Sequence, residues 1–585
     1  MFTRWRLAIF VAGLIGTIAL YKTAQYRAGN WSLAIVAGLF LIVAAYHNRL
    51  EQRIHRLRLW QQLKRTHQAR LDLDWEAIPL RPAAAPAQHP YADDLDLVGP
   101  HSLLHLLNTT VSTNGHARLT HWLLTQPPDP SDWEQRRRLI RELSRQSLLR
   151  DRLTLEARLI GEQEIDGQRL EAVLHHPVGF PRLALILTMQ ALLAAATIGL
   201  GIGSLAGQLP DYWLWSFTAY VLIYLWTDQG EELLEHAVGV HHELEKLGAV
   251  LAFVERYARR RSTALATTWA PLLSMHVNPP RLVRQAARIL HAISIKAHPL
   301  AHLVVNAFCP WDLWFARRLQ QIQARAGTLL PLWLDRLAEV EAASALATFA
   351  ALHPSYAWAT PRSAASSGNE TGAGITAQKL GHPLLPQTRR VTNDVTLRGI
   401  GSLQLITGSN MSGKSTFLRT LGINVCLAQA GAPVCAAQFE WTWCRPACCI
   451  RVEDSLEAGL SFFYAEVKRL KSILDATHDR AAPPVLYLID EIFKGTNNRE
   501  RLIGSRAYIT SLASGNGFGL VSTHDLELTD LERAVPSLTN AHFQETVSAG
   551  ALQFDYRLRP GPCPTTNALR IMELEGLPIT PKDTP

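Results

Sequence analysis

One stretch decides the fold: Gly408-Ser-Asn-Met-Ser-Gly-Lys-Ser415 fits the phosphate-binding template G-x-x-x-x-G-K-[ST] at every fixed position. It follows the apolar run 403–407 and leads into residues 416–422, which have the character of a helix start. A strand, a glycine-rich loop and a helix in this order predict a loop that binds phosphate through backbone N–H groups and the helix dipole. A glycine-rich turn that binds nothing is the alternative for this motif alone.

Two side chains of the loop are expected to carry chemistry. Lys414 would reach the β- and γ-phosphates of a bound nucleotide, and the Ser415 hydroxyl would ligate Mg²⁺. The remaining loop residues are expected to contact the nucleotide as well: Gly408, Ser409, Asn410, Met411, Ser412, Gly413 and Thr416.

An acidic pair ends a second apolar run. Five apolar residues, 485–489, precede Asp490 and Glu491. Such a run is typical of a central parallel strand buried on both faces, and open α/β sheets bind ligands at the C-terminal ends of their strands. We therefore expect Asp490 to hold the Mg²⁺ shell and Glu491 to be the base for the attacking water. A solvated acidic turn is the alternative for this pair on its own.

A third apolar run, 519–523, ends at His524. A polar group after a strand next to the carboxylate strand can contact the γ-phosphate, and a histidine can donate a hydrogen bond there. A structural histidine is the alternative. The three runs together predict an α/β domain with one nucleotide site.

These motifs together resemble the ATPase domain of the MutS family, the mismatch-repair clamp ATPases of the ABC-type superfamily. The family's loop G-P-N-M-G-G-K-S-T corresponds to residues 408–416, with its Asn and Met retained. The family's D-E-x-x-x-G-T-[SN] run corresponds to 490–497, and its T-H switch to 523–524. The signature D-x-L-x-x-G-x-S-T-F-x-x-E is similar to residues 454–466.

The resemblance implies ATP and Mg²⁺ as cofactors and a homodimer formed through the ATPase domains. In that dimer Ser461 would act on the partner's γ-phosphate, although Phe462 stands where the family has Thr. By the same resemblance Asn393 would lie near the adenine, and His542 would stack on it.

Upstream, residues 96–119 and 341–350 resemble the start of the MutS core domain and the end of its long lever helix. The sequence also departs from the family. Nothing in it resembles the mismatch-reading domain with its Phe-x-Glu wedge, and the family's S-x-G-[IL] segment is replaced at 566–569.

Composition and charge set broad limits. The 585 residues leave room for several domains. A net charge of +8 favours an anionic partner without choosing between nucleic acid and lipid. The seven cysteines lack the spacing of a zinc site, so we expect reduced thiols in a cytosolic domain.

Four uncharged apolar runs predict two transmembrane helical hairpins: 7–21 with 31–46, and 183–209 with 212–227. A secretory signal is the alternative for the first run, but a second apolar run follows at once and export would separate the ATPase from ATP. A helical hairpin buried in a soluble core is the alternative for the second pair.

Charge asymmetry predicts the orientation. Residues 49–70 are rich in arginine, whereas the loop of the first hairpin has only Lys22 and Arg27. The positive-inside rule then places the protein in the inner (cytoplasmic) membrane as a multi-pass protein, with the ATPase and core domains in the cytoplasm. The basic residues 47–70 would form either an amphipathic helix on anionic lipid or a solvated helix.

The expected fold class is an α/β P-loop (ABC-type) ATPase domain joined to an α-helical MutS core and lever domain, with two predicted transmembrane helical hairpins. The expected units are hairpin 1 (1–50), a basic juxtamembrane helix and linker (51–90), the first part of the helical core (91–180), hairpin 2 (181–228), the helical core and lever (229–360), a flexible linker (361–382) and the ATPase domain (383–580).

Two functions remain open from the sequence. The first is a membrane-associated MutS-family ATPase that binds mismatched or branched DNA and acts in DNA repair. The alternative is a membrane-bound, ATP-driven conformational switch that acts on a protein or lipid without binding DNA. An ABC transporter is a weaker third hypothesis. The L-S-G-G-Q signature is absent, and the apolar runs contain no charged residue that could line a substrate path.

Overall fold

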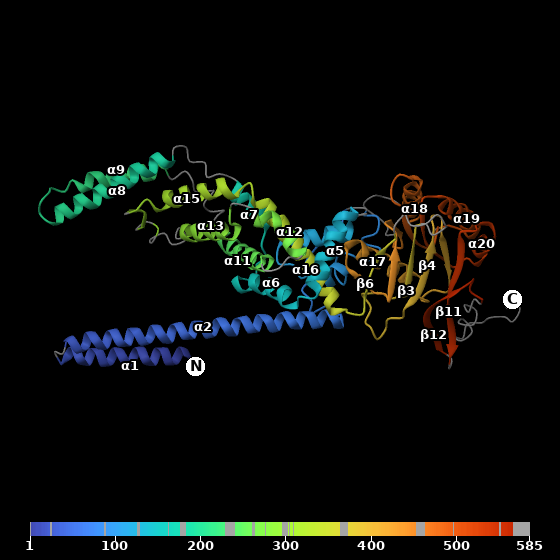
Figure 1. The fold of residues 1–585 in the computed structure, drawn as a ribbon, viewed down its shortest axis with the longest axis horizontal. Coiled ribbons are helices and arrows are strands. Elements are labelled where there is room, and N and C mark those ends of the chain that lie inside the picture. The colour runs from blue at the N-terminus through green and yellow to red at the C-terminus, as the bar shows by residue number, and fades with distance from the viewer. Residues whose placement is uncertain are drawn as a thin grey trace.

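The computed structural model is elongated, with β-sheets at one end and two helical hairpins at the other (Figure 1). It describes residues 2–23, 26–86, 89–125, 129–161, 163–175, 183–227, 240–259, 264–274, 277–294, 302, 305–307, 309–362, 373–451, 462–494, 496–548 and 551–564.

A six-stranded sheet forms the centre of the C-terminal end, in the order β12-β11-β5-β10-β9-β8. Its strands are β5 (Leu403–Thr407), β8 (Arg445–Cys449), β9 (Val485–Asp490), β10 (Gly517–Thr523), β11 (Leu538–Ser548) and β12 (Ala551–Pro560). All neighbouring pairs are parallel except β11 with β12. The three runs that the sequence predicts as strands are confirmed as β5, β9 and β10, and they lie side by side.

Helices cover both faces of this sheet. Leu486 and Leu488 share a core with α17 (Lys414–Ala430), whereas Tyr487 and Ile489 face a second core with α18 (Phe462–His478) and α19 (Asn498–Ser514). This alternation follows from the two-residue period of a strand and explains why β9 is apolar throughout. The short helices η2 (Leu526–Asp530) and α20 (Leu531–Ala534) lie between β10 and β11.

Two smaller sheets precede and flank the main one. A four-stranded sheet has the order β2-β7-β3-β4, with β2 (Thr360–Pro361), β3 (Gly374–Leu380), β4 (Asn393–Arg398) and β7 (Gln438–Trp441); β1 (Ala357–Trp358) pairs with β6 (Pro433–Val434). The predicted linker 361–382 is therefore wrong over its second half, because β3 pairs with both β4 and β7. Residues 363–372 of that linker lie outside the described part of the chain.

The middle of the molecule is helical. Its helices are α3 (Leu103–Leu107), α4 (Thr113–Leu124), α5 (Pro130–Ser144), α6 (Ser147–Ile160), α7 (Gly167–His175), α11 (His241–Ala258), α12 (Ala264–Leu273), α13 (Pro279–Ile293), α15 (Trp311–Ala326) and α16 (Leu330–Leu352). Helix α16 is buried along most of its length and leads into β1. The Trp133 indole N–H of α5 donates to the Ala428 carbonyl of α17 at 2.9 Å, so the helical region is joined to the sheet region.

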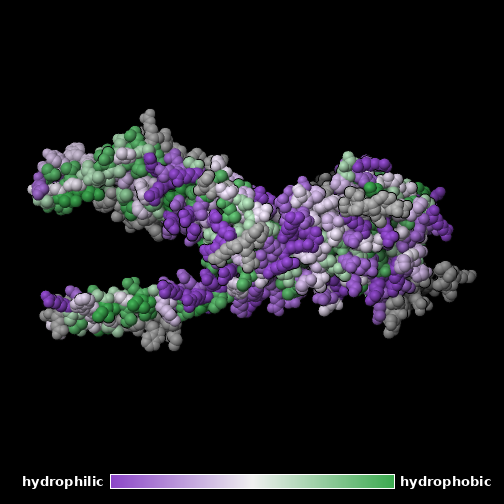
Figure 2. Space-filling view, viewed as in Figure 1, coloured by the Kyte–Doolittle hydropathy of each residue, from purple (hydrophilic) through white to green (hydrophobic). Residues whose placement is uncertain are grey.

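Two apolar hairpins extend from the helical region in the same direction, away from the sheets (Figure 1). The first is formed by α1 (Phe2–Lys22) and the start of α2 (Tyr26–Asp72), the second by α8 (Leu183–Leu205) and α9 (Trp213–Thr227). Among the described residues two helices, one in each hairpin, are by length and composition long and apolar enough to cross a membrane. Figure 2 shows apolar surface gathered on both hairpins.

Helix α2 continues far beyond the first hairpin. The predicted boundary at residue 50 falls within this one helix, whose C-terminal part packs on the helical region. There Lys64 forms an ion pair with Asp151, and Arg70 donates to the carbonyls of Leu106 (2.9 Å) and Asn108 (2.6 Å). The basic residues 47–70 therefore continue the same helix as the apolar part of the first hairpin and do not form a separate helix beside it.

Candidate nucleotide-binding site

The phosphate-binding loop lies between β5 and α17, as predicted. Gly408 and Gly413 have φ of +147° and +106°, and a Cβ at Gly408 would stand 2.8 Å from the Phe543 carbonyl oxygen. Only glycine tolerates this combination of conformation and close approach. Met411 also has a positive φ, and its side chain is 83% exposed. The loop therefore keeps its backbone available at the N-terminus of α17.

Lys414 is held inside this loop. Its ammonium donates to the carbonyls of Gly408 and Ser409, both at 2.8 Å, although the side chain is almost fully buried. Burial lowers the pKa of Lys414, and the nearby carboxylates of Glu491 and Asp490 oppose that shift. The Lys414 ammonium also lies 3.5 Å from His524 Nδ1, and it makes no ion pair among the described residues, so it is suited to receive an anionic phosphate.

Asp490 lies where three strands end. The Ser415 hydroxyl donates to one of its carboxylate oxygens at 2.6 Å, and the Ser522 hydroxyl donates to the other. The parallel register pairs Ser522 with Asp490 and brings the end of β9 beside the loop that follows β5. The hydroxyl and the carboxylate together offer hard oxygen donors, which is the ligand set that Mg²⁺ prefers.

Glu491 and His524 contact each other directly. The His524 Nε2 lies against one carboxylate oxygen of Glu491, and the Lys494 ammonium lies 3.6 Å from the other. His524 Nδ1 is also 3.0 Å from the Gly408 carbonyl. Burial alone would raise the pKa of Glu491, but the hydrogen bond and charge of His524, with the charges of Lys494 and Lys414, lower it to about 2. Glu491 is therefore a carboxylate at neutral pH.

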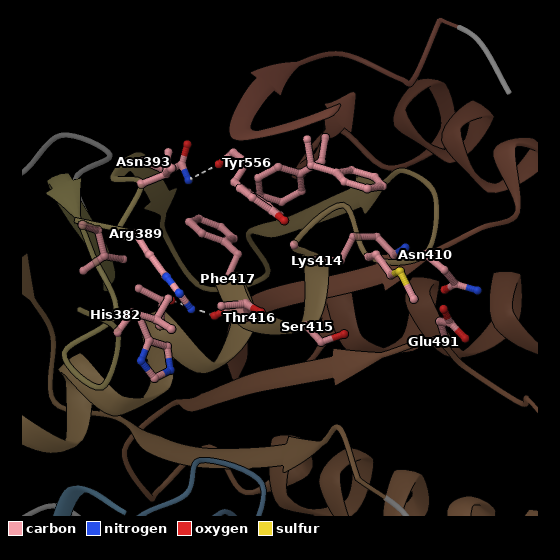
Figure 3. A pocket seen from close by; sticks show the side chains of 18 residues that line it. His382, Arg389, Asn393, Asn410, Lys414, Ser415, Thr416, Phe417, Glu491 and Tyr556 are labelled. Carbon is pink, nitrogen blue, oxygen red and sulfur yellow. Dashed lines mark hydrogen bonds between the residues drawn. The ribbon is translucent and has the colours of Figure 1, made fainter. Parts of the chain in front are cut away.

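A cavity of about 700 Å³ opens beside the loop. Figure 3 shows Asn410, Lys414 and Glu491 near one end and His382 and Arg389 toward the other. Four aromatic residues also line it: Phe417, Phe543, Phe554 and Tyr556. A pocket with a phosphate-binding loop at one end and aromatic walls further along has the chemistry to hold a nucleotide.

The two residues predicted to contact the adenine, Asn393 and His542, lie in different surroundings. Asn393 lines the cavity, but its side chain is used to join β4 to β12, donating to the Tyr556 carbonyl (2.9 Å) and accepting from the Leu558 N–H (2.8 Å). His542 does not line this cavity; it is buried, with Nδ1 2.9 Å from the Gly561 carbonyl. Ser461 lies outside the described residues.

Sequence reasoning missed two features of the site. Tyr556 has a φ of +54°, and its ring carbon would lie 3.1 Å from a Cβ at Gly413, so this residue of β12 covers the end of the loop. The buried Glu545 carboxylate accepts a hydrogen bond from the Ser409 hydroxyl. The sequence did carry a signal for Glu545, because it is an acidic residue within an otherwise strand-like segment, three residues after His542.

The fold and this site define a P-loop nucleotide-binding domain. Residues 404–581 match the family model described as MutS domain V. The DNA mismatch repair protein MutS of Natronomonas pharaonis is 32% identical over 250 residues, which cover 41% of this chain and 27% of that protein. MutS 2 of Halobacterium salinarum is 32% identical over 241 residues, covering 40% and 27% of the two chains.

A third relative, the DNA mismatch repair protein MutS of an Exiguobacterium species, is 34% identical over 208 residues, covering 34% of this chain and 24% of that protein. The chain thus matches about a quarter of the length of these curated relatives. The predicted resemblance to the MutS family is confirmed for the C-terminal part of the chain, where residues 404–581 match MutS domain V.

Proposed function

We propose that this protein is a membrane-anchored MutS-type ATPase that hydrolyses ATP with Mg²⁺. The observation that carries the proposal is the convergence of Lys414, Ser415, Asp490, Glu491 and His524 at the ends of three parallel strands. Mg²⁺ bound with ATP would neutralise the phosphates, and the residues that would hold it are Ser415 and Asp490.

The remaining roles follow from charge and position. Lys414 is placed to stabilise the β- and γ-phosphates, because it is the buried cation of the loop. Glu491 accepts a proton from the attacking water, and its low pKa keeps the carboxylate ionised for that step. His524 orients Glu491 and is close enough to the loop to respond to the γ-phosphate.

The proposed assembly is a homodimer with ATP between two ATPase domains. Its support is the match of residues 404–581 to MutS domain V together with the similarity of residues 454–466 to the family's signature. In this proposal Ser461 of each chain completes the partner's site, and the change in dimer geometry passes through α16 to the helical region.

The proposed output is ATP-dependent binding of mismatched or branched DNA in repair. It is supported by the three relatives, all of which are DNA mismatch repair proteins by name. The proposed location is the inner membrane, with the ATPase and helical regions in the cytoplasm, supported by the apolar hairpins and the basic residues that follow the first one.

Replacing the base tests the ATPase. Glu491→Gln keeps the size and the position of the side chain but removes its basicity, so ATP affinity should change little while turnover falls by about 10²–10⁴-fold. Steady-state phosphate release and nucleotide binding measure the two effects separately. Glu527→Gln, an exposed acid on η2, is the control and should hydrolyse ATP normally. Undiminished hydrolysis by Glu491→Gln would refute the assignment of the base.

A second candidate output is a switch at the membrane that acts on a protein or lipid. The observation that favours it is the pair of apolar hairpins, which point the same way (Figure 1), together with the lack of any segment that resembles the mismatch-reading domain. A salt-titrated binding assay with homoduplex, mismatched and branched DNA separates the candidates. Preference for mismatched or branched DNA in the presence of ATP supports the repair function, and binding that is absent or indifferent to DNA structure supports the switch.

A further inference from the structure

Helix α15 begins with a cluster of aromatic and arginine side chains. The rings of Trp311 and Trp314 each lie 4.7 Å from the ring of Phe315, centroid to centroid. The Arg318 guanidinium stacks 4.2 Å above the Trp314 ring, and Trp314 is nevertheless 40% exposed. A tryptophan left open to the surface beside an arginine is typical of a segment that sits at a bilayer interface.

The charge of this region is one-sided. Asp312 is the sole acidic residue of α13 and α15, and it is buried, with His302 Nε2 at 2.7 Å and the Asn306 side-chain amide at 3.3 Å. The exposed charged residues of the two helices are all arginines: Arg281, Arg284, Arg288, Arg318 and Arg325. An ordinary solvated helix pair usually carries both signs, so this surface fits an anionic partner.

The start of α15 is attached to the second hairpin. The Tyr220 hydroxyl of α9 donates to the Asn306 carbonyl, and Asn306 in turn bonds Asp312 in the first turn of α15. Helix α8 of the same hairpin also contacts α15, and Gln190 and Ala194 are buried although most of α8 is exposed. A bilayer that held this hairpin would therefore bring its headgroup layer to the first turns of α15.

Helix α2 carries basic residues at a matching level. Arg49, Arg53, Arg56 and Arg58 are exposed and follow the apolar part of the first hairpin. Figure 2 shows hydrophilic surface beyond the apolar part of each arm, and Figure 1 places α15 and the middle of α2 at similar positions along the long axis of the molecule, in separate arms. Two separate segments thus change from apolar to basic at one level of the molecule.

We propose that the face formed by Trp311, Trp314, Phe315 and Arg318 docks on the headgroup layer of a bilayer containing anionic phospholipid. The inference rests on the proposed membrane anchoring and adds to it a specific contact that neither hairpin supplies. Duplex DNA is also anionic, but it offers no apolar layer for exposed tryptophan. Continuity with an apolar hairpin therefore favours lipid as the occupant.

Cys309, an exposed thiol two residues before Trp311, provides the probe. The full-length protein carrying Cys563→Ser is labelled there with an environment-sensitive fluorophore and reconstituted into phosphatidylcholine vesicles with increasing phosphatidylglycerol. Lipids that carry a nitroxide on the headgroup should quench the label. Arg318→Gln should raise the phosphatidylglycerol fraction needed for half-maximal quenching by about fivefold. A label at Ser511→Cys, on α19, with Cys309 also replaced by Ser, should not be quenched.

Each remaining outcome counts against the inference. No quenching at Cys309 while the protein resists carbonate extraction would overturn the α15 contact and leave the anchoring proposal standing. Loss of the protein from the vesicles on carbonate extraction would overturn both. Energy transfer from the Cys309 label to dye-labelled duplex DNA, without quenching by lipid, would show that the arginine face binds nucleic acid instead.

Discussion

At the scale of single residues, the Glu491 carboxylate is kept ionised by its contacts with His524 and Lys494, which outweigh the effect of burial. Glu491 has a φ of +60°, a strained conformation for a residue with a side chain. That strain directs the carboxylate toward His524 and Lys494 at the edge of the sheet. Strained backbone at the end of a buried strand is common where a reacting group must be aimed, and here it accompanies the proposed base.

The low pKa of Glu491 predicts a pH-dependent contribution to stability. The pKa is about 2 in the folded chain against an ordinary value of 4.5, so folding favours the ionised form. The contribution is complete above the ordinary pKa and is lost as the pH falls toward the folded value. The wild-type protein should therefore have a higher melting temperature than Glu491→Gln at neutral pH. The difference between the two melting temperatures should shrink as the pH drops from about 5 to about 3. Calorimetry across this range measures it, and a difference that grows on acidification would contradict the assigned pairing.

At the scale of elements, α16 is fixed to the start of α4 by one buried carboxylate. Glu341 accepts from the backbone N–H groups of Val111 (3.1 Å) and Ser112 (3.0 Å) and from the Ser112 hydroxyl (2.8 Å). Ser112 also caps α4 through the Gly115 N–H at 2.9 Å. The proposed lever is thus connected to the helical region by hydrogen bonds as well as by apolar packing.

Removing this carboxylate should loosen that connection. Glu341→Ala leaves three buried donors without their acceptor, which should cost about 3 kcal/mol of the free energy of unfolding. Glu339→Ala is a matched control on the same helix, because Glu339 makes an ion pair with Arg336 near the surface and should cost under about 1 kcal/mol. Urea unfolding followed by circular dichroism compares the two, and equal losses would show that Glu341 has no special role.

Some strands could be predicted from the sequence and others could not. Strands β5, β9 and β10 could be predicted, because each is a short apolar run that ends in a polar residue at one edge. Strand β3 could not, because its burial is irregular and the residues before it are rich in Ser and Gly. The cavity wall that includes Tyr556 depends on the irregular register between β11 and β12, which shifts between Phe543 and Glu545 and which the sequence pattern does not record.

At the scale of the whole molecule, the sheets lie at one end and the apolar hairpins at the other (Figure 1). In the proposed function, a signal from bound nucleotide to the membrane would therefore pass through the helical region. One route is an ionic cluster between that region and the ATPase-type domain. The buried Asp94 carboxylate accepts from Arg469 (2.6 Å), and Asp96 pairs with Arg451 (2.6 Å) and Arg419 (3.6 Å). Arg419 lies on α17, the helix that begins with Lys414, so the cluster connects directly to the phosphate-binding loop.

The arrangement of the hairpins makes a topological prediction for the whole chain. If both cross the membrane with the sheets inside, both tips should react with a membrane-impermeant thiol reagent added outside intact cells. The substitutions are Thr23→Cys and Gln208→Cys, each made with Cys309→Ser and Cys563→Ser, because the other described cysteines are buried. Ser511→Cys on α19 should react only after the membrane is opened. Reaction at Thr23→Cys alone would show that the second hairpin, which is bonded to Asn306 by Tyr220 midway along α9, enters the bilayer without crossing it.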